Sequence, residues 1–393
     1  MQNHKTISRC GSLRLLVLQC SLLFMLCFTY HAALPLSALP HTSPGSITLS
    51  IQNQNFINNT EYFNKIMEGE TLFGFHFLPS VHLAITNSMG LQIGCIWSRT
   101  FGHQWPWMGI RPACSMYYRK QQNVFIVGIF NNAILTLIEP LSSSHQPLEK
   151  PHMEGFHFRL TQPTSHIAGW LDWKNCLCKK NNKPEIVTFQ LDASYGLKHT
   201  NWSIPLQLAV YHLGGQGIPI QSYSLWCAAV GLTYALTPTN TFLKKVQWAS
   251  YLVGNSYAYN RQAHERACLK VKRPFKEGWG HFHTLTISLH PVEMGVSYWY
   301  GNKFSSENMG YPLYQSICIQ QEKDSYPTQV TYYEKIRHLL FVSFAKTWEF
   351  SNGITLQTSL KPYCDLMHNL LEFGFSLQLS YTGNFHLTAL DPL

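Results

Sequence analysis

Strict alternation of apolar and polar residues is the feature that most limits how this chain can fold. The clearest case is the segment 371–383, which reads "LEFGFSLQLSYTG". One parity carries Leu371, Phe373, Phe375, Leu377 and Leu379, and the other carries Glu372, Ser376 and Gln378. Successive side chains of a strand point to opposite faces, so this segment predicts a strand with one apolar and one polar surface.

The same alternation recurs along the chain, between turn signals such as those at 87–90 and 351–353. Many of these segments have nine or more residues, which suits a bilayer, whereas strands of soluble sandwiches have about 5 to 6. Long connections are expected at 131–153, 255–278 and 302–336. The predicted strands are 70–87, 91–101, 112–119, 122–131, 154–162, 165–174, 185–195, 200–212, 221–236, 242–255, 279–289, 292–302, 337–350, 353–364 and 370–382, with a further closing piece at 385–390.

The composition helps to decide whether the apolar faces of the strands contact lipid or a protein core. Only 12% of the residues are charged, against roughly 25% in soluble domains, and 14% are aromatic. Beyond the N-terminal segment there is no run of about 18 apolar residues that could form a membrane helix. We therefore predict an all-β fold, a transmembrane antiparallel up-and-down β-barrel of about 14 to 16 strands. The five apolar residues of 371–379 are expected to face lipid, and Glu372, Ser376 and Gln378 to face the lumen. The alternative is a soluble, secreted β-sandwich that binds glycans.

The first residues resemble an export signal. Lys5, Arg9 and Arg14 precede the apolar stretch 15–28, and small residues follow it. We expect a signal peptide at 1–33, with an uncleaved signal anchor as the alternative. Residues 34–69 are expected to be a periplasmic stub or a lumen plug, and 70–393 an outer-membrane barrel. The predicted location is the bacterial outer membrane.

The net charge of +9 includes three cations of the predicted signal peptide. The remaining +6 is modest and diffuse, so it does not predict binding to nucleic acid. The densest basic stretch is expected either to be a solvated loop or to contact lipopolysaccharide phosphate or another anion. Its residues are Arg261, Arg266, Lys270, Lys272, Arg273 and Lys276, and the first five are the candidates for the anion contact. Membrane lipids and lipopolysaccharide are the predicted partners, and the sequence does not predict an oligomeric state.

The eleven cysteines are scattered and do not follow a metal-binding pattern. Cys176 and Cys178 form a C-x-C pair, which matches neither a zinc framework nor a C-x-x-C redox motif. Several others lie in apolar strands, where a thiol acts as a small apolar group. A disulfide in an exposed loop is the alternative. No metal and no cofactor are predicted.

Nineteen histidines make an enzyme worth testing. A lipid hydrolase in a barrel would need a Ser–His pair at the outer rim, and the candidates are His212, His281, His283, and His264 with Glu265. The sequence lacks G-x-S-x-G, H-E-x-x-H and P-loop motifs. His281 and His283 are expected to face the lumen, or to bind a metal if a third ligand faces them. No catalytic residue is predicted. The sequence favours a structural, pore-forming or envelope-related role, with a barrel-embedded lipid hydrolase as the alternative.

The chain resembles a family of uncharacterised outer-membrane β-barrel proteins of Bacteroides-type bacteria. The similarity covers about 55–388 and includes "AGWLDW" at 168–173, "IPLQLAVYHLGGQ" at 204–216 and "YWYGNKFSSENMGYPLYQS" at 298–316. It implies the barrel fold, the outer membrane and the barrel-assembly machinery as a partner, and it implies no reaction. Such barrels usually end on an aromatic residue, but this chain ends Asp391-Pro392-Leu393. Phe385 or Tyr381 would have to replace that residue, or the last residues form a short tail.

Overall fold

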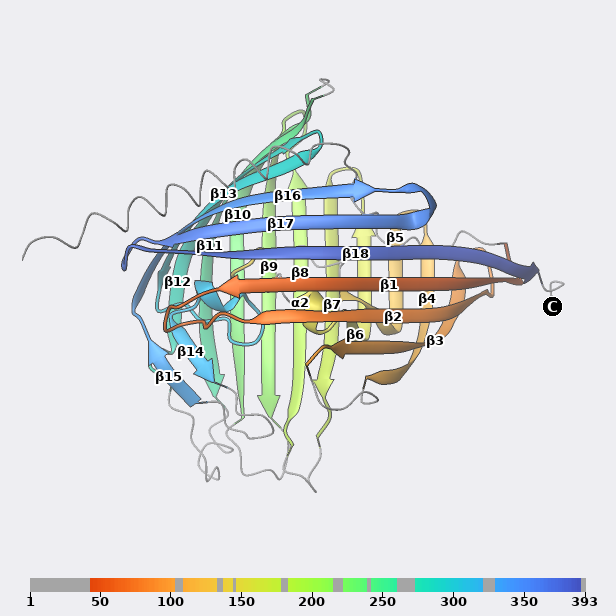
Figure 1. Ribbon diagram of the computed structural model, residues 1–393, viewed down its shortest axis with the longest axis horizontal. Helices are drawn as coiled ribbons and strands as arrows, with labels where there is room; N and C mark the ends of the chain where they lie inside the picture. Colours follow the sequence, from red (N-terminus) through yellow and green to blue (C-terminus); the bar gives the residue numbers. More distant parts are fainter. Residues whose placement is uncertain are drawn as a thin grey trace, which may run out of the picture.

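A closed antiparallel β-barrel dominates the computed structural model (Figure 1). The structure describes residues 43–102, 109–132, 137–143, 146–177, 183–214, 222–238, 242–259, 273–320 and 329–389. Within these residues, sixteen strands form the barrel. They are β1 (Ser46–Glu61), β2 (Thr71–Ala84), β3 (Met89–Thr100), β4 (Ile110–Lys120), β5 (Asn123–Asn131), β6 (His152–Thr161), β7 (Ser165–Asn175), β8 (Glu185–Gly196), β9 (Trp202–Gly214), β10 (Tyr223–Leu236), β11 (Leu243–Tyr259), β12 (Glu277–Leu289), β13 (Val292–Asn302), β16 (Ile336–Glu349), β17 (Ile354–Asp365) and β18 (Leu370–Ala389).

The few elements outside the wall are short. β14 (Ile317–Gln320) and β15 (Gln329–Tyr333) form a separate two-stranded sheet. The helical pieces within the described residues are α2 (Gln146–Glu149), η3 (Pro312–Tyr314) and η4 (Ser351–Gly353). Among the described residues, no helix is long and apolar enough to span a membrane.

Pairing of the first strand with the last closes the barrel. β1 pairs with β18 from Ser46 opposite Ala389 to Glu61 opposite Phe373, and every other barrel strand pairs with its neighbours in the wall. In Figure 1 the near strands β16, β17, β18, β1 and β2 cross the far strands β7 to β10 at a steep angle. Closure leaves no free strand edge in the wall, which a bilayer requires.

The structure confirms the predicted fold class and strand number, with one correction. All fifteen predicted strands correspond to barrel strands. The prediction that the barrel starts at residue 70 is wrong, because 46–61 form β1. Of the segment 34–69 that was predicted to be a stub or plug, 62–69 contribute to the cluster in the barrel mouth. The proposed closing piece at 385–390 continues β18, which reaches Ala389. The predicted signal peptide, 1–33, lies outside the described residues.

The two ends of the barrel differ in their connections. One end, here called the loop end, carries the connections 62–70, 132–151, 260–276 and 303–335. The other, the turn end, has connections such as 121–122, 162–164 and 290–291, and both ends of the described chain lie there. In outer-membrane barrels the long loops are extracellular and the short turns periplasmic. The same orientation is therefore expected here.

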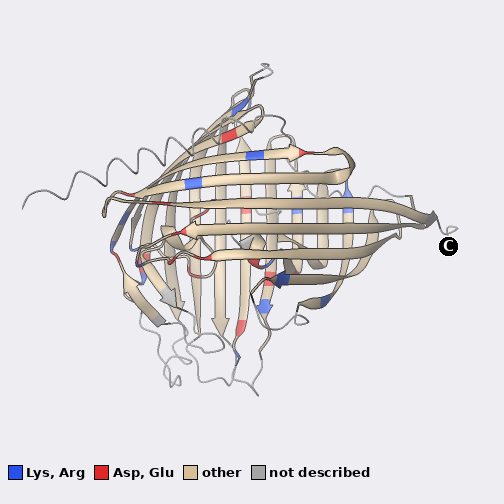
Figure 2. Cartoon of the chain, viewed as in Figure 1, with Lys and Arg blue, Asp and Glu red and all other residues tan. Residues whose placement is uncertain are grey.

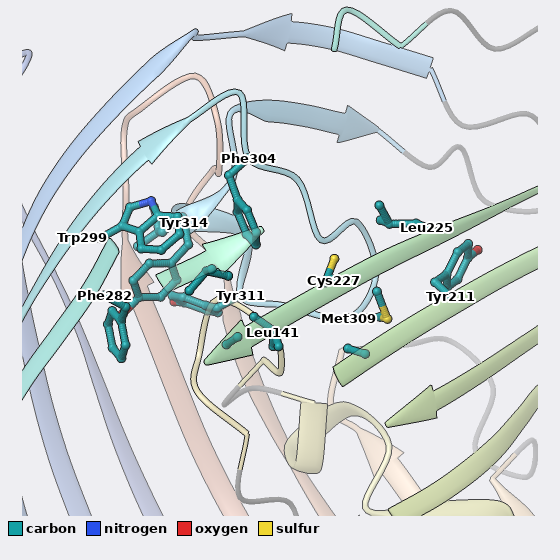
Figure 3. Close-up of a cluster of buried hydrophobic side chains, with 14 of the residues drawn as sticks. Leu141, Tyr211, Leu225, Cys227, Phe282, Trp299, Phe304, Met309, Tyr311 and Tyr314 are labelled. Atoms are coloured by element: carbon teal, nitrogen blue, oxygen red, sulfur yellow. The ribbon is translucent and has the colours of Figure 1, made fainter. Parts of the chain in front are cut away.

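Three loop-end segments fold into the barrel mouth. These segments, 62–69, 137–143 and 303–316, are called the mouth plug. Its buried side chains include Leu141, Phe304 and Tyr314, and they join inward-facing residues of the wall in one apolar cluster (Figure 3). Tyr314 makes edge-to-face contacts with Phe282 and Trp299, each at 5.7 Å between ring centroids.

Hydrogen bonds fasten the mouth plug to itself and to the wall. The hydroxyls of Tyr62 and Tyr311 lie 2.9 Å apart, and burial raises the pKa of Tyr62 to about 12. Glu139 accepts hydrogen bonds from Tyr314 and from Lys361 of β17. These contacts join segments that lie far apart in the sequence, so the mouth plug is part of the folded barrel.

The outer and inner faces of the wall differ as the alternation predicts. On β18 the five apolar residues Leu371, Phe373, Phe375, Leu377 and Leu379 are each at least 39% exposed. Glu372 is buried and accepts hydrogen bonds from Tyr363 of β17 and Asn64 of the mouth plug. Ser376 bonds Ser359, and Gln378 accepts from Gln54 at 2.9 Å. Charged residues are sparse along the strands (Figure 2).

Candidate functional site on the outer wall

A serine and a histidine face each other on the outer wall near the loop end. Their direction follows from their neighbours, because Tyr211 and Tyr223 point inward and contact the mouth plug. Asn308 donates to the Tyr211 hydroxyl at 3.4 Å, and Tyr223 donates to Glu307 at 2.5 Å. The adjacent residues, His212 of β9 and Ser224 of β10, therefore project outward.

The geometry of this pair suits nucleophilic chemistry. His212 and Ser224 are directly opposite in the β9–β10 ladder, and His212 Nδ1 lies 2.9 Å from Ser224 Oγ. Both side chains are partly exposed. In the tautomer that carries its proton on Nε2, His212 accepts the hydroxyl proton at Nδ1. This is the hydrogen bond by which a histidine activates a serine.

A groove lies beside the pair on the same outer surface. It has a volume of about 570 Å³, and Trp226 and Trp279 are among the residues that line it. The other lining residues are Ala228, Gly254, Asn255, Ser256, Glu277, Gly278, Asn302 and Lys303. A Cβ atom built at Gly254 would meet only the Gly278 carbonyl oxygen, at 3.8 Å, so space is free above this residue.

The groove lies next to the His212–Ser224 pair along β10. Trp226 follows Ser224 by two residues on β10 and therefore shares its outward face. Gly254 of β11 pairs with Trp279 of β12, so the two indoles stand on either side of small residues. Exposed tryptophans near strand ends are typical of the interface between bilayer and water.

Histidines and tyrosines continue the outer surface across β12, β13 and β16. Phe282 contacts Tyr314 inside the barrel, so its neighbours His281 and His283 point outward. The expectation that these two histidines face the lumen is therefore wrong. His283 stacks on Tyr298, whose hydroxyl lies 2.9 Å from His338 Nδ1.

Two other Ser–His contacts occur in the described part of the chain, and both face the lumen. His76 Nδ1 lies 3.0 Å from Ser98 Oγ, while its Nε2 lies 2.8 Å from the Leu148 carbonyl oxygen. His82 Nε2 lies 3.3 Å from Ser80 Oγ. Of these three described Ser–His pairs, only His212 with Ser224 faces outward.

The sequence missed the pairing of His212. It is the one candidate histidine that the structure brings within hydrogen-bond reach of a serine, and Ser224 was not singled out. His264 and Glu265 lie outside the described residues. So do Arg261, Arg266, Lys270 and Lys272 of the basic stretch. Of the two described members, Lys276 is exposed, whereas the Arg273 side chain is buried and bonds Glu307 at 2.7 Å, so Arg273 does not form an exposed anion contact.

One group of side chains in the described residues has its ligand atoms close enough for a metal. It consists of Glu334, Asp365 and His368 at the loop end. Arg337 Nη1 lies 2.7 Å from Glu334 and 3.4 Å from Asp365. The guanidinium offsets part of the charge of these two carboxylates, and the group is described here as a salt-bridge cluster. The described cysteines, Cys95, Cys114, Cys176, Cys227, Cys318 and Cys364, are free thiols.

These observations define a closed sixteen-stranded β-barrel with an apolar outer wall, a filled mouth and an outward Ser–His pair. The chain belongs to the Lipid A 3'-O-deacylase-type family, whose model matches residues 39–390. No curated protein matches the chain significantly.

Three solved structures are among those similar to this chain. The OmpT loop L8 deletion mutant of Vibrio cholerae has 7% identity over 86% of this chain and 99% of its own, with a TM-score of 0.48. OccK8 (OprE) of Pseudomonas aeruginosa has 10% identity over 86% and 98%, with a TM-score of 0.47. OpdL of the same organism has 12% identity over 86% and 98%, with a TM-score of 0.46.

Proposed function

We propose that this protein is an outer-membrane hydrolase that removes an acyl chain from lipid A, with Ser224 as nucleophile and His212 as general base. The observation that carries the proposal is the 2.9 Å contact between these side chains on the outward face near the loop end. Membership of a family described as lipid A 3'-O-deacylase-type supports the choice of substrate.

The proposed site lies where its substrate would be. We assign the apolar outer wall to lipid, including Phe373, Phe375 and Leu377 of β18, and the loop end to the cell exterior. His212 lies two residues from the loop-end terminus of β9, and Ser224 is the second residue of β10. The pair would therefore meet the head-group region of the outer leaflet, where the ester bonds of lipid A lie close to its sugars.

The reaction is an acyl transfer followed by hydrolysis. His212 Nδ1 takes the Ser224 hydroxyl proton as Oγ attacks the ester carbonyl carbon. The bond to the sugar oxygen then breaks, and the histidine returns its proton to that oxygen, which leaves an acyl-serine. Water, deprotonated by the same nitrogen, releases the fatty acid and restores the hydroxyl.

The groove supplies a place for the acyl chain. Its small residues, including Ala228 and Gly254, leave room between Trp226 and Trp279. Burial of methylene groups there would hold the ester in register with Ser224, because each buried methylene contributes about 0.8 kcal/mol. Positioning of the reacting groups is itself a large part of catalysis.

The test uses the full barrel in detergent–lipid micelles with lipopolysaccharide as substrate. Mass spectrometry of the lipid A should show the loss of one acyl chain, with an equal amount of free fatty acid. Ser224→Ala should abolish the reaction, and His212→Gln should slow it by about 10² to 10⁴. The matched control is Ser98→Ala, which removes the serine of a lumen-facing Ser–His pair.

The outcomes separate three cases. Loss of activity in Ser224→Ala with retention in Ser98→Ala supports the proposal. The reverse pattern would move the reaction into the lumen. If the natural barrel leaves lipid A intact, a structural, pore-forming or envelope-related role replaces the hydrolase.

A further inference from the structure

A second site lies inside the barrel, away from the outer wall. A cavity of about 480 Å³ follows the inner faces of β1 to β7. It is lined in part by Arg119 of β4, by His152, His157 and Arg159 of β6, and by His166 of β7. Gln121 and Gln122, which form the turn between β4 and β5, also line it, so the cavity extends to the turn end.

Two of its histidines are buried without hydrogen-bond partners. The side chains of His152 and His157 are 6% and 1% exposed, and neither ring nitrogen of either residue has a partner in the described part of the protein. Arg159 Nε also lacks one. Buried polar groups are normally paired, because leaving one unpaired costs the desolvation penalty of that group. Within the described residues, these nitrogens are therefore left available to a bound molecule.

The charge of the cavity indicates which kind of ligand could bond these unpaired nitrogens. Two arginines supply positive charge to its described lining, three histidines supply further ring nitrogens, and neither Asp nor Glu occurs among these residues. Asp192 comes within 3.7 Å of His166 but does not line the cavity. Charges of one sign in a cleft with low-dielectric walls concentrate the field and attract counter-ions. Guanidinium groups recognise carboxylate and phosphate oxygens with strong, directional hydrogen bonds.

We infer that the lumen cavity binds a small organic anion that carries phosphate or carboxylate groups and enters from the turn end. Arg119 and Arg159 would meet the acidic groups, while His152 and His157 would donate to further oxygens. The apolar side chains Leu78, Val124 and Ile126 in the same wall would contact the rest of the molecule. A cavity of this volume accommodates a ligand of metabolite size.

This site is independent of the proposed hydrolase. The Ser–His pair lies on the outer faces of β9 and β10, whereas the cavity lies on the inner faces of other strands. A molecule in the cavity is separated from the bilayer by the wall. Ser224→Ala should consequently bind the anion as the natural protein does, whatever it does to lipid.

Isothermal titration calorimetry of the folded barrel in non-ionic detergent tests the inference, with pyrophosphate and citrate as probes. Heat-modifiable migration on a gel should confirm that each variant is folded. The double variant Arg119→Gln/Arg159→Gln should weaken binding by about tenfold or more, since hydrogen bonds to charged groups are the strong ones. His157→Gln should weaken it less.

The matched control is Arg111→Gln, which removes one positive charge from an inward position of the same strand β4 but outside the cavity. Retained affinity in this control, with loss in the double variant, supports the site. Phosphate and carboxylate ligands are distinguished by which probe binds more tightly. Absence of binding by either probe, or equal weakening in Arg111→Gln and the double variant, overturns the inference and leaves a water-filled cavity.

Discussion

Arg273 Nε donates to Glu307 Oε1 at 2.7 Å, and both side chains are almost completely buried at the mouth of the barrel. Arg273 precedes β12, and Glu307 belongs to the mouth plug. Glu307 also accepts from Tyr257 of β11 at 2.8 Å. A single carboxylate thus connects the mouth plug to the wall and to a second loop.

We expect Glu307→Gln to destabilise the barrel strongly, because it leaves the Arg273 guanidinium buried without a counter-charge. Breaking such a buried pair costs about 3 to 5 kcal/mol. Equilibrium unfolding by denaturant in detergent would measure the difference. The control is Glu154→Gln in the pair with Arg111, where both side chains are more than 40% exposed and the loss should stay below about 1 kcal/mol. Equal losses in the two variants would contradict the assigned role of burial.

The face assignment of β18 makes a second prediction. Phe375 lies near the middle of the β17–β18 ladder, opposite Leu360, with 40% of its side chain exposed. If that face meets lipid, Phe375→Arg should cost about 2 to 4 kcal/mol near the bilayer midplane. Gln378→Arg, on the inward face of the same strand, should be tolerated. Unfolding of both variants from lipid vesicles provides the comparison, and similar stabilities would refute the lipid face.

The strand pattern was predictable from sequence because its period is local. Each of the fifteen predicted strands shows its two faces within about ten residues. β1 was missed for a physical reason. Ile47, Leu49 and Ile51 begin an apolar face, but Asn53 and Asn55 continue it, so the alternation fails midway. In the structure, β1 is held in the barrel by pairing with β18 and β2. The spacing of residues in the sequence does not reveal these long-range pairings.

Only one residue of the candidate pair, His212, could be predicted from the sequence. His212 continues the parity of Leu206 and Leu208, and this could have placed it on the outer face. Its pairing with Ser224 depends on the β9–β10 register, and residues 215–222 separate the two strands. The mouth plug was hidden for the same reason, because its contacts connect segments that are hundreds of residues apart, as Tyr62 and Tyr311 are.

A bulky substitution in the outer groove tests whether the groove binds the acyl chain of the substrate. Gly254→Leu places a side chain above the groove floor without a backbone clash, since a Cβ there meets only one oxygen at 3.8 Å. If the groove holds the acyl chain, we expect KM for lipid A to rise about tenfold, equivalent to about 1.4 kcal/mol, with kcat little changed. Gly254→Ala is the graded control and should have a small effect. An unchanged KM in Gly254→Leu would place the acyl chain elsewhere.

The filled mouth predicts how the barrel conducts ions. Leu141, Phe304 and Tyr314 are fully buried there, so the natural protein should show little conductance in planar bilayers. The double variant Tyr62→Ala/Tyr311→Ala removes two rings and the hydrogen bond between them, which weakens the mouth plug. Truncating two buried rings costs a few kcal/mol of packing free energy, on the order of 3 to 5 kcal/mol for each large aromatic side chain. We therefore expect the mouth plug to loosen and the conductance to increase severalfold. Tyr118→Ala, on the exposed outer face, is the control and should leave conductance unchanged. High conductance in the natural protein would show that an open path passes the plug, and it would strengthen the pore-forming alternative against the hydrolase.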